Sequence, residues 1–514
     1  MIKRAIISVS DKAGIADFSR KLVEMGIEIL TTGGTAKLLA SEGIPCKEVA
    51  EVTGFQECLD GRVKTLHPRI HGGILAIRSN PEHMKRIEDL GIETIDLIVV
   101  NLYPFKSTIQ KPKVEFDECV ENIDIGGPSM LRAAAKNHRD VTVVTDPADY
   151  DLVLRQISST GDTSYQTRFN LARKVFEHTA AYDALIAQYF QSRTPEKELP
   201  DLYTITFDKV SELRYGENPH QSATFFRNAI PVAGSLSEAV QKNGKELSYN
   251  NIADADATIC CLKEFSEPTV VAVKHANPCG VGSADTIFEA WEKAFESDKV
   301  SIFGGIVAAN REIDAKTAEE MSKIFLDVII APSYSPEALE ILCAKKNLRV
   351  LELPAITAPI PENELNYKRV LGGLLVQDHD RNIYNEKDIR TVTKNEPDPG
   401  LLEDMKFAMK VVKYVKSNAI VVVKNKQTVG IGPGQTNRIG SAEIAFRFAG
   451  DKTKGAVLGS DAFFPFSDCV DAAHEAGIAA IVQPGGSMRD QESIDACNTY
   501  GIPMVFTGTR HFRH

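Results

Sequence analysis

A cation and an imidazole stand side by side at Lys274 and His275, where the apolar run VVAV that begins at Val270 ends. A lysine can stabilise a developing oxyanion, and a histidine can move a proton near neutral pH. The pair therefore predicts non-covalent transfer of an acyl group. Cys279 allows a second interpretation, a cysteine hydrolase or transferase with His275 as base, although a small buried hydrophobe is the usual role of a cysteine.

The same stretch, VKHANPCGVG, has part of the signature of a zinc deaminase. Such an enzyme needs H-x-E followed by P-C-x-x-C. Pro278 and Cys279 are present, but Gly282 occupies the second cysteine position and no H-x-E precedes them. We expect no catalytic metal.

The segment GRVKTLHPRIHGG, residues 61–73, gathers cations and two histidines between glycines. A solvated basic loop is the common interpretation of such a run. We favour a site in a held conformation, because Pro68 and the apolar residues restrict the chain. Lys64 could stabilise an oxyanion, and His67 or His71 could move a proton.

The turn LTTGGTAKLL, residues 30–39, is expected to lead from a strand into a helix. Free amides at a helix N-terminus, with hydroxyls and glycines nearby, can hold a phosphate or a carboxylate. A tight strand-to-helix turn without a ligand would use the same residues. Ser10 and Lys12, which follow the preceding strand, favour the anion site.

Three further polar residues are expected at the edge of the same sheet. Tyr103 follows an apolar strand, Asp124 precedes a Gly-Gly-Pro helix start, and Lys136 lies within that helix. Together they could order a substrate and polarise a carbonyl, although capping and core packing explain each of them alone.

The loop LRYGENPHQSA, residues 213–223, packs Arg214, Tyr215, Asn218 and His220 around a glycine and a proline, which favours a binding loop. The glycine-rich GIGPGQ is only a weak dinucleotide signal. The aromatic SDAFFPFSD is either core or a wall for a flat heterocycle. The terminal RHFRH would ordinarily be a frayed tail.

The elements that position these residues follow from hydrophobic periodicity. From residue 1 to about 190, apolar runs alternate with helical patterns, which predicts a parallel sheet with crossover helices and ligands beyond the C-terminal strand ends. The expected strands are residues 4–10, 27–32, 96–103 and 141–146, and the expected helices are 12–25, 35–42, 129–138 and 165–190.

The C-terminal part contains an internal repeat. VAVKHANPCGVGSAD aligns with VVVKNKQTVGIGPGQ, so that Lys274 matches Lys424 at an offset of 424 − 274 = 150 residues. IIAPSYS and IVQPGGS match at nearly the same offset. We expect a duplicated α/β unit in which only the first copy carries the histidine.

Composition limits the class of protein. A chain of 514 residues exceeds one hydrophobic core, and 59 Lys+Arg against 70 Asp+Glu, a net charge of −11, argue against a nucleic acid or an anionic membrane as the main partner. Nine cysteines without a C-x-x-C pair, no apolar run of membrane-spanning length and no secretory pattern at MIKRAIISVSDKAG predict a cytoplasmic protein.

As a set, these segments resemble the bifunctional purine-synthesis family that joins AICAR (5-aminoimidazole-4-carboxamide ribonucleotide) transformylase to IMP (inosine monophosphate) cyclohydrolase. SVSDK, TTGGTAKL, GRVKTLHPRIHGG, NLYPF, NIDIGGPSMLRAAAKN, LRYGENPHQ, VKHANPCG, FGGIVA, GIGPGQ, SDAFFPF and RHFRH occur in the family's order over residues 8–514. The resemblance implies formyl transfer from 10-formyltetrahydrofolate to AICAR, then ring closure of the formylated product to IMP with loss of water. It implies no metal and no tightly bound cofactor.

The resemblance also implies a fold: an α/β protein with an N-terminal methylglyoxal-synthase-like (MGS-like) parallel-sheet domain, residues 1–193, and a C-terminal transformylase domain, residues 194–514. The latter would consist of two duplicated cytidine-deaminase-like units without zinc, roughly 201–370 and 371–514. Family members act as homodimers whose transformylase sites use both subunits, so we expect a homodimer acting on small molecules. Residues 351–368 match no known role.

Residue roles follow from the same resemblance. The transformylase centre would be Lys274 and His275, and the cyclohydrolase group would be Lys64, Tyr103, Asp124 and Lys136. Phosphate and ribose in the cyclohydrolase would be held by Ser10, Lys12, Thr32, Gly34, Thr35, Arg62 and Thr65. The transformylase nucleotide would be held by Arg214, Tyr215, Asn218, Asn418, Gln435, Arg510 and His514, with Asp327 and Phe463 on the folate side or pocket wall and Gly304 at a pocket backbone position.

Two other functions remain possible from the residues alone. One is an acyltransferase with a non-catalytic, nucleotide-sensing module at residues 1–190, for which the anion site would suffice. The other is the Cys279 hydrolase. Lys64, Tyr103 and Lys136 distinguish the first from the bifunctional enzyme, because a module that only binds does not need them.

Overall fold

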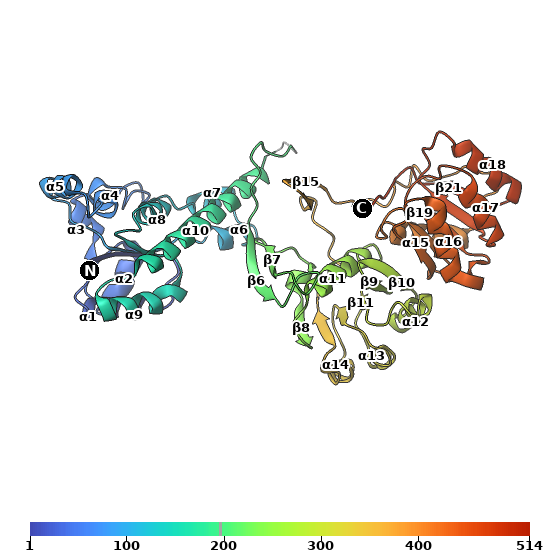
Figure 1. The fold of residues 1–514 in the computed structure, drawn as a ribbon, viewed down its shortest axis with the longest axis horizontal. Coiled ribbons are helices and arrows are strands. Elements are labelled where there is room, and N and C mark those ends of the chain that lie inside the picture. Colours follow the sequence, from blue (N-terminus) through green and yellow to red (C-terminus); the bar gives the residue numbers. More distant parts are fainter. Residues whose placement is uncertain (195–197) are drawn as a thin grey trace. The chain divides into compact units, whose positions relative to one another are not determined.

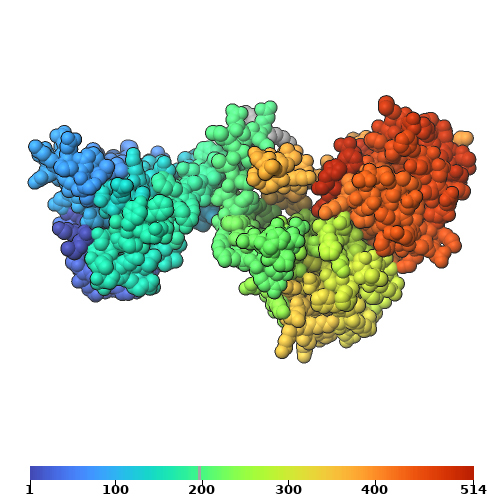
Figure 2. Space-filling view, viewed as in Figure 1, coloured from blue at the N-terminus to red at the C-terminus, as the bar shows by residue number. Residues whose placement is uncertain are grey.

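The computed structural model describes residues 1–194 and 198–514. Within them the chain forms two compact units, Met1–Phe207 and Asp208–His514 (Figure 1). The space-filling view shows the surface of the first unit in blue to blue-green and that of the second in green to red (Figure 2).

The division between the units falls after the boundary expected at residues 193 and 194. Helix α10 (Tyr165–Gln191) explains the difference, because its side chains hold the segment that follows it. Gln188 Nε2 donates to the carbonyl oxygen of Thr204 at 3.1 Å. The polar stretch that suggested the boundary includes residues 195–197, which lie outside the described residues.

The first unit is built on a parallel sheet with the strand order β3-β2-β1-β4-β5. Four of its strands coincide with the predicted apolar runs. The two residues of β3 are exposed, so no apolar run marks this strand in the sequence. The strands are β1 (Arg4–Val9), β2 (Glu28–Thr31), β3 (Lys47–Glu48), β4 (Leu97–Asn101) and β5 (Thr142–Val144).

Helices cover both faces of this sheet, and its central strands are therefore apolar along their length. Ile6 and Ile7 of β1 and Ile98 of β4 are completely buried. The helices are α1 (Ile15–Glu24), α2 (Gly33–Ser41), α3 (Val49–Thr53), α4 (Pro68–Leu75), α5 (Pro81–Asp89), α6 (Phe105–Ile109), α7 (Phe116–Glu121), α8 (Gly126–Lys136), α9 (Tyr150–Thr160) and α10, with a 3-10 turn at Pro147–Asp149.

Helix α4 gives a held conformation to the second half of residues 61–73. Pro68 occupies the first helical turn, where its fixed φ suits a helix and its missing N–H is not needed. His67 precedes it, and its Nδ1 accepts from the backbone N–H of Arg69 at 3.1 Å. The second half of the stretch is thus a capped helix, and only residues 61–67 form a loop.

The second unit contains two six-stranded sheets with the same topology. The first has the order β10-β9-β11-β12-β13-β8, and the second has the order β18-β17-β19-β20-β21-β16. Corresponding pairs run in the same sense: the two hairpins and the edge pairs are antiparallel, and the β11-β12-β13 and β19-β20-β21 pairs are parallel. This agreement confirms the duplication predicted from the 150-residue offset.

The two copies also match helix for helix. The first consists of β8 (Val240–Asn243), α11 (Tyr249–Leu262), β9 (Thr269–Lys274), β10 (Asn277–Ser283), α12 (Ile287–Ser297), β11 (Ile306–Ala309), α13 (Ala315–Ser322), β12 (Val328–Ala331), α14 (Pro336–Cys343) and β13 (Arg349–Glu352). The second consists of β16 (Arg390–Thr391), α15 (Pro399–Val412), β17 (Ile420–Val423), β18 (Thr428–Gly432), α16 (Arg438–Ala449), β19 (Val457–Ser460), α17 (Asp468–Glu475), β20 (Ala480–Gln483), α18 (Asp490–Tyr500) and β21 (Met504–Phe506).

Two two-stranded sheets stand outside the repeated sheets: β6 (Phe207–Leu213) with β7 (Ala223–Asn228), and the antiparallel hairpin of β14 (Leu365–Val370) with β15 (Gly373–Asp378). Short 3-10 turns lie at Leu236–Glu238 and Gly450–Thr453. The subdomain boundary expected between residues 370 and 371 falls at the tip of the β14-β15 hairpin. In the described parts of the chain, no helix has the length and apolar character needed to cross a lipid bilayer.

Candidate active site

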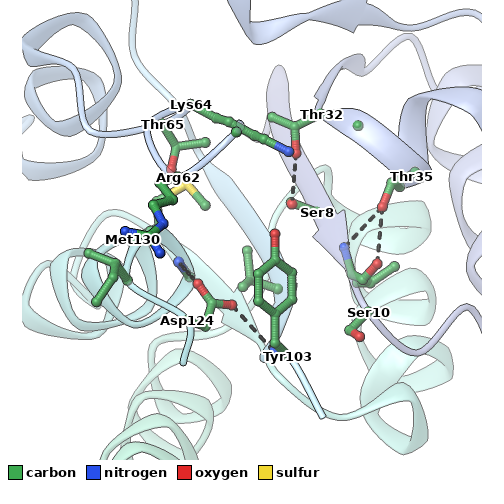
Figure 3. Close-up of a pocket in the computed structure, with 18 of the residues that line it drawn as sticks. Ser8, Ser10, Thr32, Thr35, Arg62, Lys64, Thr65, Tyr103, Asp124 and Met130 are labelled. Atoms are coloured by element: carbon green, nitrogen blue, oxygen red, sulfur yellow. Dashed lines mark hydrogen bonds between the residues drawn. The ribbon is translucent and has the colours of Figure 1, made fainter. Parts of the chain in front are cut away.

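A cavity of about 560 Å³ opens at the C-terminal ends of β1 and β4 in the first unit, where helices α2 and α8 begin (Figure 3). This is the edge at which parallel α/β sheets hold ligands. Ten of the predicted residues line it: Ser10, Lys12, Thr32, Gly34, Thr35, Arg62, Lys64, Thr65, Tyr103 and Asp124.

The start of α2 forms one wall of the cavity. Thr32 is the N-cap residue but makes no side-chain cap hydrogen bond; its hydroxyl lies 3.0 Å from that of Ser8. Gly33 has a φ of 50°, a conformation that favours glycine. The first amides of the helix thus face the cavity with the positive end of the helix dipole, as an anion site requires.

Lys12 lies beside this helix start. Its Nζ donates to Thr35 Oγ1 at 3.0 Å and to the carbonyl oxygen of Val9. Burial lowers the pKa of Lys12, and the nearby Asp11 carboxylate opposes this in part. A bound anion would favour the charged form of the lysine further.

Asp124 and Tyr103 face the cavity from the opposite side. The Asp124 carboxylate accepts from the backbone N–H of Gly127 at 2.8 Å and from that of Tyr103 at 3.4 Å. Burial raises the pKa of Asp124, although both backbone hydrogen bonds oppose the shift. A carboxyl group with a raised pKa, in a cavity, suits proton transfer.

Lys64 reaches into the cavity across a glycine. A Cβ on Gly61 would lie 2.6 Å from Lys64 Cε, so the absence of a side chain at Gly61 gives the lysine its place. Lys64 Nζ lies 3.3 Å from a carboxylate oxygen of Glu57. Arg62 is instead paired with Glu121 through Nε, at 3.1 Å, and through Nη2.

Three residues considered for this chemistry lie elsewhere. Lys136 is exposed at the last position of α8, about 15 Å along the helix from Gly126 at the cavity. His67 accepts the cap hydrogen bond of α4, and His71 lies inside that helix, where burial lowers its pKa. None of the three lines the cavity as the described residues form it.

Asn101 is a cavity residue that sequence reasoning missed. Its Oδ1 accepts from the backbone N–H of Ser10 at 2.5 Å and from that of Asp11 at 2.9 Å, which fixes the chain that carries Lys12. Its position at the end of a buried strand was the available signal. Asp60, Glu121 and Met130 also line the cavity without having been predicted.

A second cavity, of about 280 Å³, lies between the two repeats of the second unit. Lys274, His275 and Cys279 come from the first repeat, and Thr428 and Ile431 from the second. The Lys274 ammonium donates to the carbonyl oxygen of Phe303 at 2.7 Å, and His275 is exposed at the tip of the β9-β10 hairpin.

The structure opposes a nucleophilic Cys279. Burial raises the pKa of its thiol to about 12, and the nearby Lys274 opposes the shift only in part. The thiol donates to the carbonyl oxygen of Ala272 at 3.5 Å. Catalytic cysteines have lowered pKa values, so this thiol is a packing residue. Among residues 1–194 and 198–514, no three His, Cys, Asp or Glu side chains are grouped to hold a metal ion.

The other predicted residues of the second unit are dispersed. Arg214, Tyr215 and Asn218 lie in the turn between β6 and β7, where the Arg214 guanidinium is 4.9 Å from the centre of the Tyr215 ring. Asn418 Nδ2 donates to the carbonyl oxygen of Gln435 at 2.9 Å. The remaining five predicted substrate-binding residues of this unit are Gly304, Asp327, Phe463, Arg510 and His514. Within the described chain, none of these ten residues lines the Lys274-His275 cavity.

The C-terminal tail is held in place rather than frayed. His511 is buried, and its ring nitrogens lie 2.7 Å from a carboxylate oxygen of Asp380 and 2.6 Å from the carbonyl oxygen of Ile383. The backbone N–H of Arg513 donates to Ser417 Oγ at 2.9 Å. These contacts place Arg510 and His514 at either side of a fixed segment.

The fold and its two cavities define a two-site α/β enzyme: a parallel-sheet unit with a polar cavity at the start of α2, joined to a duplicated mixed-sheet unit that presents a Lys-His pair. Similarity to known proteins defines the family of this chain more narrowly than its fold does. A family described as "AICARFT/IMPCHase bienzyme" matches residues 134–447, and an "MGS-like domain" matches residues 14–129.

Relatives match the chain from end to end. A protein of Acetivibrio thermocellus named "Bifunctional purine biosynthesis protein PurH" is 59% identical over 514 residues, which is 100% of both chains. Proteins of the same name from Ruminiclostridium cellulolyticum and Bacillus subtilis are each 58% identical, again over 100% of both chains. The chain therefore belongs to the AICARFT/IMPCHase bienzyme family.

Proposed function

We infer that this chain is a bifunctional enzyme of purine synthesis that has both activities of its family, AICAR formyltransferase and IMP cyclohydrolase. The observation that carries the inference is the identity of 59% to a bifunctional purine biosynthesis protein over the full length of both chains. The match of two family descriptions to successive parts of the chain supports it. We further propose that residues 1–193 carry the cyclohydrolase and residues 194–514 the transformylase.

For formyl transfer we propose 10-formyltetrahydrofolate as co-substrate and Lys274 with His275 as catalytic residues. The 5-amino nitrogen of AICAR forms a bond to the formyl carbon, and the bond from that carbon to N10 of the folate breaks. The Lys274 ammonium stabilises the oxyanion that develops on the formyl oxygen. His275 takes the proton from the amine and delivers it to N10.

For ring closure we propose Lys64, Tyr103 and Asp124 as the catalytic group. The carboxamide nitrogen bonds to the formyl carbon, and the formyl oxygen leaves as water with one proton from that nitrogen and one from the formamide nitrogen. Lys64 stabilises the oxyanion, while the Tyr103 hydroxyl and the Asp124 carboxyl, whose pKa is raised by burial, move the protons. Lys136 was also predicted to belong to this catalytic group, but it does not line the cavity.

The start of α2, with Lys12 and Thr35, is proposed to hold the 5′-phosphate of the nucleotide in the cyclohydrolase. The remaining predicted residues of this cavity, which are Ser10, Thr32, Gly34, Arg62 and Thr65, would hold phosphate and ribose.

We also propose that the transformylase works as a homodimer in the cytoplasm. Ten predicted substrate-binding residues of the second unit do not line the Lys274-His275 cavity of the same described chain, which supports a site completed by a second copy. The nine free cysteines support a reducing compartment.

The test is a coupled assay of purified protein with AICAR and 10-formyltetrahydrofolate, in which IMP should form. Lys274→Ala should remove formyl transfer and leave ring closure of supplied formyl-AICAR intact. Lys64→Ala should do the reverse. Loss of both activities from a folded single variant would contradict the division of the activities between the two units. Intact ring closure in Lys64→Ala would favour the alternative in which the first unit is a nucleotide-sensing module.

A further inference from the structure

The hairpin turn that carries His275 has an unusual backbone. His275 and Ala276 are the two residues between β9 and β10, with φ angles of 55° and 57°. Positive φ at both positions belongs to a type I′ turn, which usually contains Asn-Gly or Asp-Gly. Histidine is tolerated there more often than most residues, but alanine is not. The turn therefore needs support from outside itself.

Asp254 supplies this support. One carboxylate oxygen of Asp254 accepts from the backbone N–H of His275 at 3.0 Å, and the other accepts from that of Ala276 at 2.8 Å. Asp254 lies in the second turn of α11, and the start of this helix is fixed by a capping box between Ser248 and Asn251. A rigid helix thus holds both amides of the turn with one side chain.

The hairpin is also held at its two ends. Lys274 Nζ donates to the carbonyl oxygen of Phe303. Asn277 Nδ2 donates to the carbonyl oxygen of His275 at 3.1 Å, and its Oδ1 accepts from the backbone N–H of Lys416 in the second repeat at 3.0 Å. His275, on this fixed backbone, lines the cavity.

The second repeat contains the same arrangement without the histidine. Asn425 and Lys426 have φ angles of 54° and 53°. The Asp404 carboxylate accepts from both of their backbone amides at 2.7 Å. Asp404 follows Asp254 by 404 − 254 = 150 residues, the offset of the repeat. The clamp is thus part of the duplicated fold, but only one copy of it carries an imidazole.

We infer that Asp254 is a positioning residue for formyl transfer. It holds the His275 backbone in the left-handed conformation, so that the imidazole stays beside Lys274 at the cavity. It acts through the backbone of the turn and not on the substrate. The inference rests on the proposed role of Lys274 and His275.

The decisive variant is Asp254→Asn, which keeps the shape of the side chain. The asparagine side chain has only one acceptor oxygen, so it can accept from only one of the two backbone N–H groups of the turn. Its NH2 group would face the other N–H, which would then have no acceptor. We expect kcat for formyl transfer to fall about 10- to 100-fold, as for a misplaced catalytic group. The KM for AICAR and the ring closure of supplied formyl-AICAR should remain at the parent values.

Two further variants separate positioning from a general loss of stability. Asp404→Asn breaks the matching clamp in the repeat without a histidine, so it should lower the melting temperature of the protein and leave kcat nearly unchanged. Ala276→Gly, added to Asp254→Asn, should restore a large part of kcat, because glycine adopts positive φ without a clamp.

Unchanged kcat in Asp254→Asn would overturn the inference. So would an equal loss of kcat in Asp404→Asn, or no recovery with Ala276→Gly. His275→Ala is assayed beside them: retained formyl transfer in that variant would instead refute the proposed role of the Lys274-His275 pair.

Discussion

At the residue scale, the chemistry of the first cavity depends on side chains whose environment changes their protonation. Burial lowers the pKa of Lys12 and raises that of Asp124. One group thus gives up its proton more readily than usual, and the other keeps its proton longer. Both effects follow from removing charge from water, and a bound phosphate would counteract the first.

The lowered pKa of Lys12 predicts how nucleotide binding depends on pH. Only the protonated lysine attracts a phosphate dianion, so the affinity for IMP should fall as the pH rises from neutrality towards the ordinary lysine value of 10.5. Lys12→Met should weaken IMP binding roughly 10- to 100-fold at neutral pH, the effect of one hydrogen bond to a charged group. The measurement is IMP titration by calorimetry at several pH values.

Lys21→Met is the matched control, because Lys21 is exposed in the last turn of α1 and does not line the cavity. It should bind IMP as the parent does. A Lys12→Met variant that retains the full decline of affinity with pH would show that another group is responsible.

Sequence reasoning recovered the residues whose role is local. Ser10, Lys12 and Thr35 follow strand ends or open a helix, and the structure places them at one cavity. It missed Asn101 and Asp254, because each acts on a backbone segment that is distant in sequence. His67 shows the opposite failure, since a residue type suited to catalysis serves there as a helix cap.

At the element scale, apolar and helical patterns located four of the five strands of the first unit and its helices α1, α2, α8 and α10, but they did not locate α9. Strand β3 has two exposed residues and gives no periodic signal. Helix α4 was obscured because the cations Arg62 and Lys64 that precede it drew attention to a site, although Pro68 is a known marker of a helix start. The β9-β10 turn was unpredictable from its own residues, because Asp254 stabilises it from another element.

The C-terminal tail is the element whose role depends most on one unpredicted residue. His511 is bonded at both ring nitrogens and holds the segment between the predicted substrate residues Arg510 and His514. His511→Ala should release the tail and raise the KM for AICAR about tenfold or more, since the tail loses both hydrogen bonds of its buried imidazole. Steady-state kinetics of formyl transfer measure this effect.

Removal of residues 510–514 should raise the KM at least as far as His511→Ala does. Ring closure of supplied formyl-AICAR should be unaffected in both variants, because the tail belongs to the second unit. An unchanged KM in the truncated protein would return these residues to the role of an ordinary chain end.

At the scale of the whole molecule, the sequence predicted the repeat more firmly than the limits of its parts. An offset of 150 residues between two short segments corresponds to two sheets with the same strand order. The division after Phe207 was less accessible, because it depends on contacts of α10 with the segment that follows. Domain limits are set by packing, to which local composition is only a guide.

The separate cores of the two units predict how the protein unfolds. In the described chain, the hydrophobic cluster of the first unit lies between Ile2 and Val175, and those of the second unit lie between Leu236 and Phe506. Calorimetry should therefore show two transitions.

IMP at 100 times its Kd should stabilise the first unit by about 2.7 kcal/mol, which raises its transition roughly 5–10 °C. The second transition should move less, and Lys12→Met should remove about half or more of the first shift. One cooperative transition that IMP moves as a whole would show that the two units unfold together.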